Sequence, residues 1–435
     1  MDFNQVIYQI YPLGFCDAPR ENDHRQAHRI RRVLDWVDHF QKLGITQILF
    51  NPVFESSSHG YDTIDCRRID ARLGTNEDFR EVCDALHKAG IGVILDAVFN
   101  HVGRDNPMFR DVQERKWDSP YKDWFYINFS DSWARDGFSY ADWEGHQELV
   151  KLNLQNPEVK QYLFDSVDLW IEQFGIDGLR LDTAYCLDQQ FLRELRDHVK
   201  YGHPDFLIIG EMINGDYNVL LKEDLVDSVT NYECRKGLFS SMNTHNLFEI
   251  GYSLNRQFGH EPWCLYQGRH LLSFVDNHDV DRIASTLNDP RDLPLIYDLM
   301  YAMPGMPCIY YGSEWGAEGK RTRESDAELR PCFDKPEWNE LTKHLSQLNA
   351  MRLANPVFTD GDYFQICTMN QAWGFMRSME HSLLIFLINI SDDTMHLQFN
   401  TPVESAEDLL THETVSLKNG IGLPAKSSRF LYHSR

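Results

Sequence analysis

The 435-residue sequence has little of what marks secreted, membrane-embedded or metal-clustered proteins. No lysine or arginine precedes Arg20, and the N-terminal stretch MDFNQVIYQIYPLGF enters an alternating apolar pattern directly, so we predict no signal or transit peptide. No apolar run approaches the roughly 18 residues of a transmembrane helix. The nine cysteines are odd in number and have no CxxC or zinc-type spacing. These features indicate a cytoplasmic protein with reduced thiols.

Positive charge is also scarce, since 42 lysines and arginines stand against 66 aspartates and glutamates, for a formal net charge of -24. A surface of this sign repels nucleic acids and anionic membranes, so we expect neither as a partner. It is compatible with a neutral substrate. The sequence does not decide between a monomer and a homodimer.

Short β-like runs alternate with helix-like segments over roughly the first 350 residues. The predicted strands are residues 6–12, 44–53, 90–100, 175–184, 206–212, 227–232, 270–279 and 306–314. Amphipathic stretches lie between most of them, and those at 28–44 and 76–90 end in the glycine expected just past a helix. Because parallel strands need long crossovers, this order predicts an α/β fold, a (β/α)8 TIM barrel formed by residues 1–101 and 154–355.

Two segments depart from this alternation. Residues 102–153, rich in Trp, Tyr, Asp and Gly, are too long for an ordinary loop, and we interpret them as an inserted subdomain B after the third strand. Its aromatic side chains would either form a small core or serve as stacking platforms beside a cleft. Residues 356–435 alternate without a helical period, which predicts a C-terminal antiparallel β-sandwich domain.

Polar residues cluster where the predicted strands end, the place where barrels of this kind build their active sites. They are Asp96, Asn100 and His101 after the third strand, Arg180 and Asp182 after the fourth, Glu211 after the fifth, and Asp276, His278 and Asp279 after the seventh. Carboxylates from different strands would repel one another unless a positive charge or a proton compensates. Arg180 lies two residues before Asp182 and therefore points to the same side, where it can hold that carboxylate ionised.

Cleavage of a glycosidic bond with retention needs a carboxylate nucleophile and a carboxylic acid roughly 5 Å apart. Asp182 and Glu211, on adjacent strands, fit this separation. With Arg180 nearby, Asp182 is the better nucleophile. Glu211, in the apolar context IIGEMI, is better placed to have a raised pKa and to act as the acid and then the base.

The remaining polar residues suit the same chemistry. Asp279 would stabilise a positively charged, oxocarbenium-like transition state, and His101 and His278 would donate to sugar hydroxyls. A metal-dependent hydrolase using the histidines and aspartates as ligands is the competing interpretation, and it lacks the early HxH pair expected of a dinuclear site. Taken alone, the VDNHD stretch is also typical of a simple turn with a satisfied histidine.

Eight stretches in this order carry a resemblance: IYQIYPLGF, GYDTIDC, DAVFNH, KLNLQNPEV, GLRLDTA, GEM, FVDNHD and MPGMPCIYYGSE. Over nearly its whole length the sequence resembles the α-amylase family of glycoside hydrolases. The resemblance implies Asp182 as nucleophile, Glu211 as acid/base and Asp279 as transition-state stabiliser. It further implies five substrate-binding residues, which are Tyr61 under the sugar ring, His101, Arg180 and His278 around the same sugar, and Arg330 at the next sugar outward.

One departure concerns metal binding. Many α-amylases have an aspartate that helps to hold a structural calcium where this sequence has Lys151, in VKLN, although Asn100 matches another ligand position. An ammonium group repels calcium and can supply positive charge itself. We therefore expect no calcium at this site, no other metal and no organic cofactor.

Within the family, Lys151, DSVTNY and PGMPCIYYGSE look most like the neopullulanase and cyclomaltodextrinase branch, whereas FVDNHD is closer to other branches. Members of that branch usually carry an extra N-terminal β domain that builds a dimer, and this sequence starts almost at its first strand. The sequence thus predicts a retaining hydrolase of α-1,4 bonds in maltodextrins, cyclodextrins or pullulan fragments. A transglycosylase, an α-1,6-acting glucosidase and an inactive carbohydrate-binding relative remain alternatives.

Overall fold

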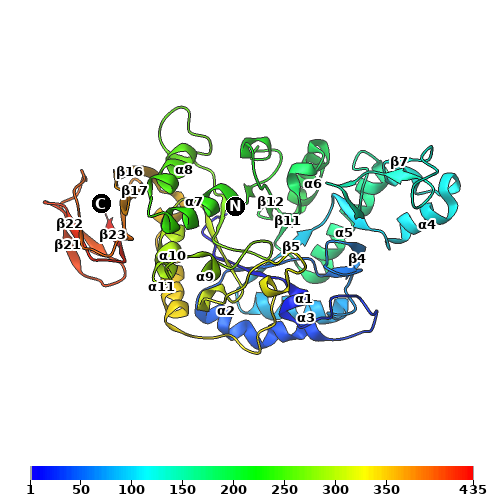
Figure 1. Ribbon diagram of the computed structural model, residues 1–435, viewed down its shortest axis with the longest axis horizontal. Helices are drawn as coiled ribbons and strands as arrows, with labels where there is room; N and C mark the ends of the chain where they lie inside the picture. Colours follow the sequence, from blue (N-terminus) through cyan, green and yellow to red (C-terminus); the bar gives the residue numbers. More distant parts are fainter. Residues whose placement is uncertain (1, 435) are drawn as a thin grey trace.

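The computed structural model describes residues 2–434, and a barrel of eight parallel strands lies at its centre (Figure 1). The strands are β1 (Ile7–Ile10), β2 (Gln47–Phe50), β5 (Gly92–Ala97), β11 (Gly178–Leu181), β12 (Leu207–Gly210), β13 (Ser228–Val229), β14 (Leu272–Phe274) and β15 (Met306–Tyr310). Their order in the sheet is β13-β12-β11-β5-β2-β1-β15-β14, and a parallel bridge between Thr230 and Leu272 joins the two outer strands. The predicted barrel is confirmed.

Helices cover the outside of the barrel. The longer ones are α2 (Val37–Leu43), α3 (Asn76–Lys88), α5 (Pro157–Phe174), α6 (Gln189–Gly202), α7 (Tyr232–Asn243), α8 (Phe248–Phe258), α10 (Asp292–Ala302) and α11 (Glu340–Ala354). The single helix expected over 28–44 is a 3-10 segment, η1 (Arg29–Trp36), followed by α2, which Gly44 ends at φ 85°. Between β12 and β13 there is only the short turn η5 (Tyr217–Val219).

Shorter elements extend the barrel loops. The helical turns are α1 (Pro12–Phe15), η4 (Ala184–Cys186), α9 (Ile283–Thr286), η6 (Ser313–Trp315), η7 (Ala327–Leu329) and α12 (Val357–Asp360). A hairpin of β3 (Phe54–Ser56) and β4 (Thr63–Ile69) follows β2. The sequence did not predict this hairpin, because its polar stretches lack clear alternation.

The chain between β5 and α5 forms the part of the molecule that is farthest from the C-terminus (Figure 1). It contains β6 (His101–Gly103), α4 (Pro107–Arg115), η2 (Lys116–Asp118), η3 (Lys122–Trp124), β7 (Ile127–Asn128), β8 (Ser139–Tyr140), β9 (Asp142–Trp143) and β10 (His146–Lys151). Phe109 packs edge-on against Phe125 and Phe138, and all three are buried. Part of the aromatic content therefore makes a local core, as one of the two interpretations expected.

The C-terminal elements lie at the opposite end of the molecule (Figure 1). An antiparallel sheet contains β16 (Asp362–Thr368), β17 (Ala372–Ser378), β18 (Ser382–Asn389), β23 (Ser427–Ser434), β20 (Ser405–Asp408) and β21 (Thr414–Ser416), in that spatial order. A ribbon of β19 (Met395–Leu397) and β22 (Ile421–Leu423) packs on it over an apolar cluster. The second layer of the predicted sandwich is therefore a two-stranded ribbon.

Two global features complete the fold. Within residues 2–434 no helix combines the length and apolar character needed to cross a bilayer. All nine cysteines are unpaired, and four of them are buried.

Candidate active site

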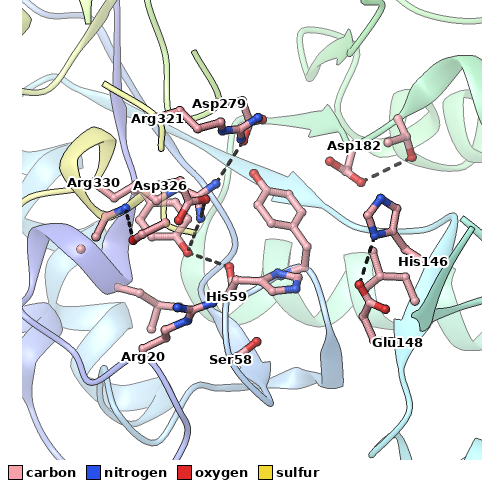
Figure 2. A pocket seen from close by; sticks show the side chains of 18 of the residues that line it. Arg20, Ser58, His59, His146, Glu148, Asp182, Asp279, Arg321, Asp326 and Arg330 are labelled. Carbon is pink, nitrogen blue, oxygen red and sulfur yellow. Dashed lines mark hydrogen bonds and ion pairs between the residues drawn. The ribbon is translucent and has the colours of Figure 1, made fainter. Parts of the chain in front are cut away.

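A cavity of about 700 Å³ opens at the carboxyl ends of the barrel strands. Asp182, Glu211 and Asp279, which follow β11, β12 and β14, line its floor. Figure 2 shows His146, from the inserted segment, on the side of Asp182, and the arginines around Asp279 on the other side. The inserted segment therefore supplies one wall of the cavity.

Strand alternation explains why these polar residues face inward. Apolar side chains fill the barrel interior one layer below the cavity, among them Ile7, Leu49, Ile94, Ile209 and Phe274. Two residues further along the same strands, on the same face, stand Gln9, Asn51, Asp96, Glu211 and Asp276. These five strands, β1, β2, β5, β12 and β14, thus contribute one apolar residue each to the core and one polar residue each to the layer above it.

Arg180 is the centre of this polar layer, and its side chain is 4% exposed. Its Nη1 atom lies 2.8 and 2.9 Å from the two carboxylate oxygens of Asp96 and 2.9 Å from Oδ1 of Asp182. Its Nη2 atom lies 2.7 Å from Oε1 of Glu211. The register pairs Leu181 with Gly210, so Asp182 and Glu211 follow paired positions on neighbouring strands. One guanidinium therefore brings three carboxyl groups together.

This sharing sets the protonation of the pair. Burial raises the pKa of Asp182 well above its usual value, against the opposing effect of Arg180. Burial also raises the pKa of Glu211, again against Arg180. The sequence predicted that Arg180 would hold Asp182 ionised, and the contact exists, but one positive charge cannot balance three carboxylates. The free site therefore favours holding a proton on the pair formed by Asp182 and Glu211.

The backbone at Thr183 adds a further constraint on Glu211. Thr183 has φ 43° and ψ 44°, a left-handed conformation that is uncommon for a β-branched residue. In this conformation its backbone N–H donates to Oε2 of Glu211 over 2.8 Å. Glu211 is thus fixed from two directions, by Arg180 on one oxygen and by Thr183 on the other.

Asp279 has a different environment on the opposite side of the cavity, and its side chain is 35% exposed. Its Oδ2 atom lies 3.0 Å from Nε2 of His278, and its Oδ1 atom lies 3.1 Å from Arg330 and 3.8 Å from Arg321 (Figure 2). Burial alone would raise the pKa of Asp279, but contact with His278 and the positive charges of Arg330 and Arg180 hold it well below its usual value.

The structure brings all eight predicted site residues together. The cavity is lined by Tyr61, His101, Asp182, Glu211, Asp279 and Arg330. Arg180 and His278 are almost fully buried and contact these lining residues from behind. The Tyr61 ring stacks on His278 with centroids 5.7 Å apart, and its hydroxyl donates to Asp96 over 3.0 Å.

His101 is a buried imidazole at the edge of the cavity, with a relative exposure of 1%. Burial lowers its pKa to about 3, so the ring is neutral at ordinary pH. Among residues 2–434, no side chain or backbone group forms a hydrogen bond with its Nε2 atom. A buried polar atom without a partner at a cavity wall is free to bind a ligand hydroxyl.

Sequence reasoning missed three residues of this region. Gln9 stands in the stretch IYQIYPLGF and Asn51 in the predicted strand 44–53, and the signal that could have found them is their position two residues beyond a buried apolar residue. Trp143 lines the cavity with its ring 6.1 Å from that of His101, and no local pattern points to it. Asp276, by contrast, accepts bonds from Ser313 and is part of the scaffold.

The position where the family resemblance would place a calcium ion lies beside Asn100 and Lys151. Lys151 lies directly opposite His101 in the antiparallel pair of β10 and β6. The Oδ1 atom of Asn100 has no partner within the described chain, so one neutral oxygen is available. Across residues 2–434, no group of three or more His, Cys, Asp or Glu side chains is arranged to hold a metal ion. Calcium prefers several carboxylate and carbonyl oxygens, which an amide beside a lysine does not supply.

Known proteins share both the sequence and the architecture. The family model described as alpha amylase, catalytic domain, matches residues 9–344. A maltogenic alpha-amylase of Bacillus acidopullulyticus is 31% identical over 98% of this chain and 76% of its own length, and neopullulanase 2 of Thermoactinomyces vulgaris is 32% identical over 95% and 74%. The structure of a cyclic alpha-maltosyl-(1→6)-maltose hydrolase from Arthrobacter globiformis superposes with a TM-score of 0.84 at 25% identity, covering 99% of this chain and 98% of that one. The chain belongs to the α-amylase family of glycoside hydrolases.

Proposed function

We propose that this protein hydrolyses α-1,4-glucosidic bonds of maltodextrins with retention, through a glucosyl group bound covalently to Asp182. The observation that carries the proposal is the contact of Asp182 and Glu211 with the two terminal nitrogens of Arg180, on neighbouring strands. Relatives named maltogenic alpha-amylase, neopullulanase and cyclomaltodextrinase support an α-glucan substrate. The substrate class also fits a strongly acidic protein, because maltodextrins are uncharged.

The first step forms the covalent intermediate. A carboxylate oxygen of Asp182 attacks the anomeric carbon while the bond from that carbon to the leaving oxygen breaks, and Glu211 transfers its proton to the leaving oxygen. The raised pKa values of Asp182 and Glu211 keep a proton within this pair, and the first step requires that proton on Glu211 and an ionised Asp182. Asp279 stays ionised and stabilises the positive charge that develops on the sugar.

The second step releases the sugar. Glu211, now a carboxylate, takes a proton from water as the water oxygen attacks the anomeric carbon, and Asp182 leaves. Transglycosylation differs only in the group that attacks, a sugar hydroxyl in place of water. In both cases the two inversions retain the anomeric configuration.

Five residues would bind the substrate. The Tyr61 ring offers a flat face to the sugar, and Nε2 of His101 is available for one of its hydroxyls. Arg330 would contact the next sugar outward. Arg180 and His278 would act mainly through the carboxylates that they contact, because neither lines the cavity in the free protein.

The proposal includes a site without calcium and a cytoplasmic location. The lysine at position 151 and the lack of carboxylates around Asn100 support the first point. The second is supported by the nine unpaired cysteines and by a relative named intracellular maltogenic amylase, from Bacillus subtilis, which is 30% identical over 90% of this chain.

Hydrolysis of maltohexaose at neutral pH with EDTA present tests the proposal. We expect short maltooligosaccharides from the unmodified protein and a loss of roughly 10⁴-fold or more in Asp182→Asn, which lacks the nucleophile. Products longer than maltohexaose would indicate transglycosylation. Cleavage that EDTA abolishes would contradict the calcium-free site, and activity that survives in Asp182→Asn would contradict the assigned nucleophile.

A second substrate class deserves a parallel assay. The Arthrobacter globiformis protein, whose name specifies a cyclic substrate with α-1,6 bonds, matches this chain over nearly its full length. Comparing kcat/KM for that cyclic tetrasaccharide and for maltohexaose assigns the preference. A higher value for the cyclic substrate would replace the linear maltodextrin as the principal substrate.

A further inference from the structure

A line of buried polar side chains runs beneath the cavity from Asp96 to His278. Nδ2 of Asn51 lies 3.0 Å from Oδ2 of Asp96, and Oδ1 of Asn51 lies 3.0 Å from Nε2 of Gln9. The same Nε2 atom of Gln9 lies 3.0 Å from Nδ1 of His278. All four side chains belong to residues at most 5% exposed, so water does not complete their hydrogen bonds.

Asp96 determines which groups donate and which accept along this line of hydrogen bonds. Both carboxylate oxygens of Asp96 accept hydrogen bonds from Nη1 of Arg180, over 2.8 and 2.9 Å. A carboxylate held by a guanidinium in this way only accepts hydrogen bonds. Asn51 must therefore turn its NH2 group toward Asp96, and its oxygen must point the other way.

The same logic continues through Gln9. The oxygen of Asn51 can only accept, so Gln9 must present its NH2 group to it. Of the two hydrogens on this nitrogen, one is directed to Asn51 and the other to Nδ1 of His278. Nδ1 is then an acceptor without a proton, and the ring proton must lie on Nε2.

We propose that Gln9 and Asn51 are positioning residues that hold His278 as the neutral tautomer with its proton on Nε2. This proton points toward Oδ2 of Asp279, 3.0 Å away, and the hydroxyl of Tyr61, 2.6 Å away. Because Tyr61 donates its own hydroxyl hydrogen to Asp96, its oxygen acts as an acceptor, and it also lies 3.1 Å from Nδ2 of Asn51. The inference rests on the proposed function, because it gives His278 a role beside the transition-state stabiliser.

The other groups around His278 agree with a neutral ring. Tyr11 and Tyr61, two uncharged rings, stack on it with centroids 6.1 and 5.7 Å away. Arg330 donates to its backbone oxygen over 3.1 Å. Nε2 faces the carboxylate of Asp279 at 3.0 Å and, at the longer distance of 3.4 Å, Nδ2 of Asn51, so the nearer charged acceptor favours a proton on Nε2. The atom that faces Nδ1 is the amide nitrogen of Gln9, a donor, so a second ring proton would have no acceptor there.

A neutral His278 matters for the chemistry at Asp279. Arg330 already places one positive charge against Asp279, and an imidazolium would add a second, which would further weaken the attraction of Asp279 for the cationic sugar of the transition state. A neutral N–H orients the carboxylate without cancelling its charge. Gln9 and Asn51 thus keep the negative charge of Asp279 directed at the substrate.

The tautomer can be read in the full-length protein without substrate. Long-range ¹H–¹⁵N correlation spectra of the ¹⁵N-histidine-labelled protein at neutral pH distinguish the two neutral tautomers from the imidazolium. The His278 signal is identified by its loss in His278→Gln. We expect the pattern of a proton on Nε2, and a proton on Nδ1 or on both nitrogens would overturn the inference. Because no turnover is needed, this result is independent of whether maltodextrins are cleaved.

Variants of Gln9 connect the tautomer to the rate. In Gln9→Glu the carboxylate accepts from Nδ1, so we expect a doubly protonated His278 and a fall in kcat of roughly ten- to a hundredfold with little change in KM. Gln9→Met removes the donor and should give a mixture of tautomers with a smaller fall in kcat.

The matched control is Gln47→Met, which replaces another barrel glutamine at the start of β2, away from the cavity. It should leave the His278 signal and kcat unchanged. An unchanged His278 pattern in both Gln9 variants, or an equal loss of kcat in the Gln47 variant, would show that Gln9 has only a structural role.

Discussion

The two sides of the cavity use carboxylates in opposite ways. On one side, Asp182 and Glu211 share the single charge of Arg180 with Asp96, and burial raises the pKa of both. On the other side, Asp279 has Arg330 in contact and a hydrogen bond from His278, and its pKa is lowered. One side is short of positive charge and favours holding a proton, whereas the other has enough to stay ionised.

This difference in surrounding charge suits the carboxyl groups on the two sides to different chemical roles. A group that must give and take a proton needs a raised pKa, and a group that must stabilise a cation needs to remain charged. Burial raises the pKa on both sides, and the number of positive charges around each carboxylate decides whether this effect is overcome. Changing that number on either side should therefore produce distinct kinetic effects.

Glu211→Gln should give the largest effect, with kcat for maltohexaose reduced by roughly 10²- to 10⁴-fold, because no proton reaches the leaving oxygen. The raised pKa of Glu211 means that activity of the unmodified protein falls as the pH rises through that pKa, and this alkaline limb should vanish in the variant. The measurement is the pH dependence of kcat/KM.

A substrate that needs no protonation separates this effect from misfolding. Maltosyl fluoride, with azide as the second nucleophile, should restore turnover in Glu211→Gln, since fluoride leaves without an acid and azide needs no base. Glu223→Gln, an exposed carboxylate on the loop after the same strand, is the control and should keep the alkaline limb. Failure of the fluoride to restore turnover would argue against the acid/base role.

Asp279→Asn should lower kcat by roughly 10²- to 10³-fold, because the negative charge opposite the cationic sugar is lost. Unlike the Glu211 variant, it should not be restored by maltosyl fluoride and azide, since the charge is needed whatever group leaves. Turnover of the fluoride in both variants measures this contrast. Restoration in both would mean that the two sides do not differ in the way described.

Arg330→Met and Arg321→Met should give the smallest effects, and they should differ from each other. Arg330 is 11% exposed and bonds Asp279 over 3.1 Å, so its loss should lower kcat/KM about tenfold, equivalent to one charge-assisted hydrogen bond of about 1.5 kcal/mol. Arg321 is 52% exposed at 3.8 Å, and its loss should stay within about twofold. Equal effects would contradict the importance of burial on this side.

Much of the barrel and several site positions follow from local patterns in the sequence. Strand alternation and strand ends depend on neighbouring residues, so the positions of Asp182 and Glu211 at the carboxyl ends could be predicted. The roles assigned to them stay predictions until they are measured.

Other features depend on residues that are far apart in the chain. The contact of Gln9 with His278 joins positions 269 residues apart, and Trp143 reaches the cavity only because the inserted segment folds over it. The ion pairs of Arg180 with three carboxylates likewise depend on distances between strands, which the sequence does not contain.

The barrel closes between β13 and β14 through a single bridge, and this weak closure has a consequence for the resistance of the protein to heat. Glu211 and Asp279 follow strands separated by β13, which has two residues and joins β14 through one bridge, between Thr230 and Leu272. Asp182 and Glu211, in contrast, follow strands paired at four positions. Weakly paired segments open before the rest of a fold. On warming, the spacing between Glu211 and Asp279 should therefore loosen first, so that the enzyme loses its catalytic geometry while most of its barrel is still intact.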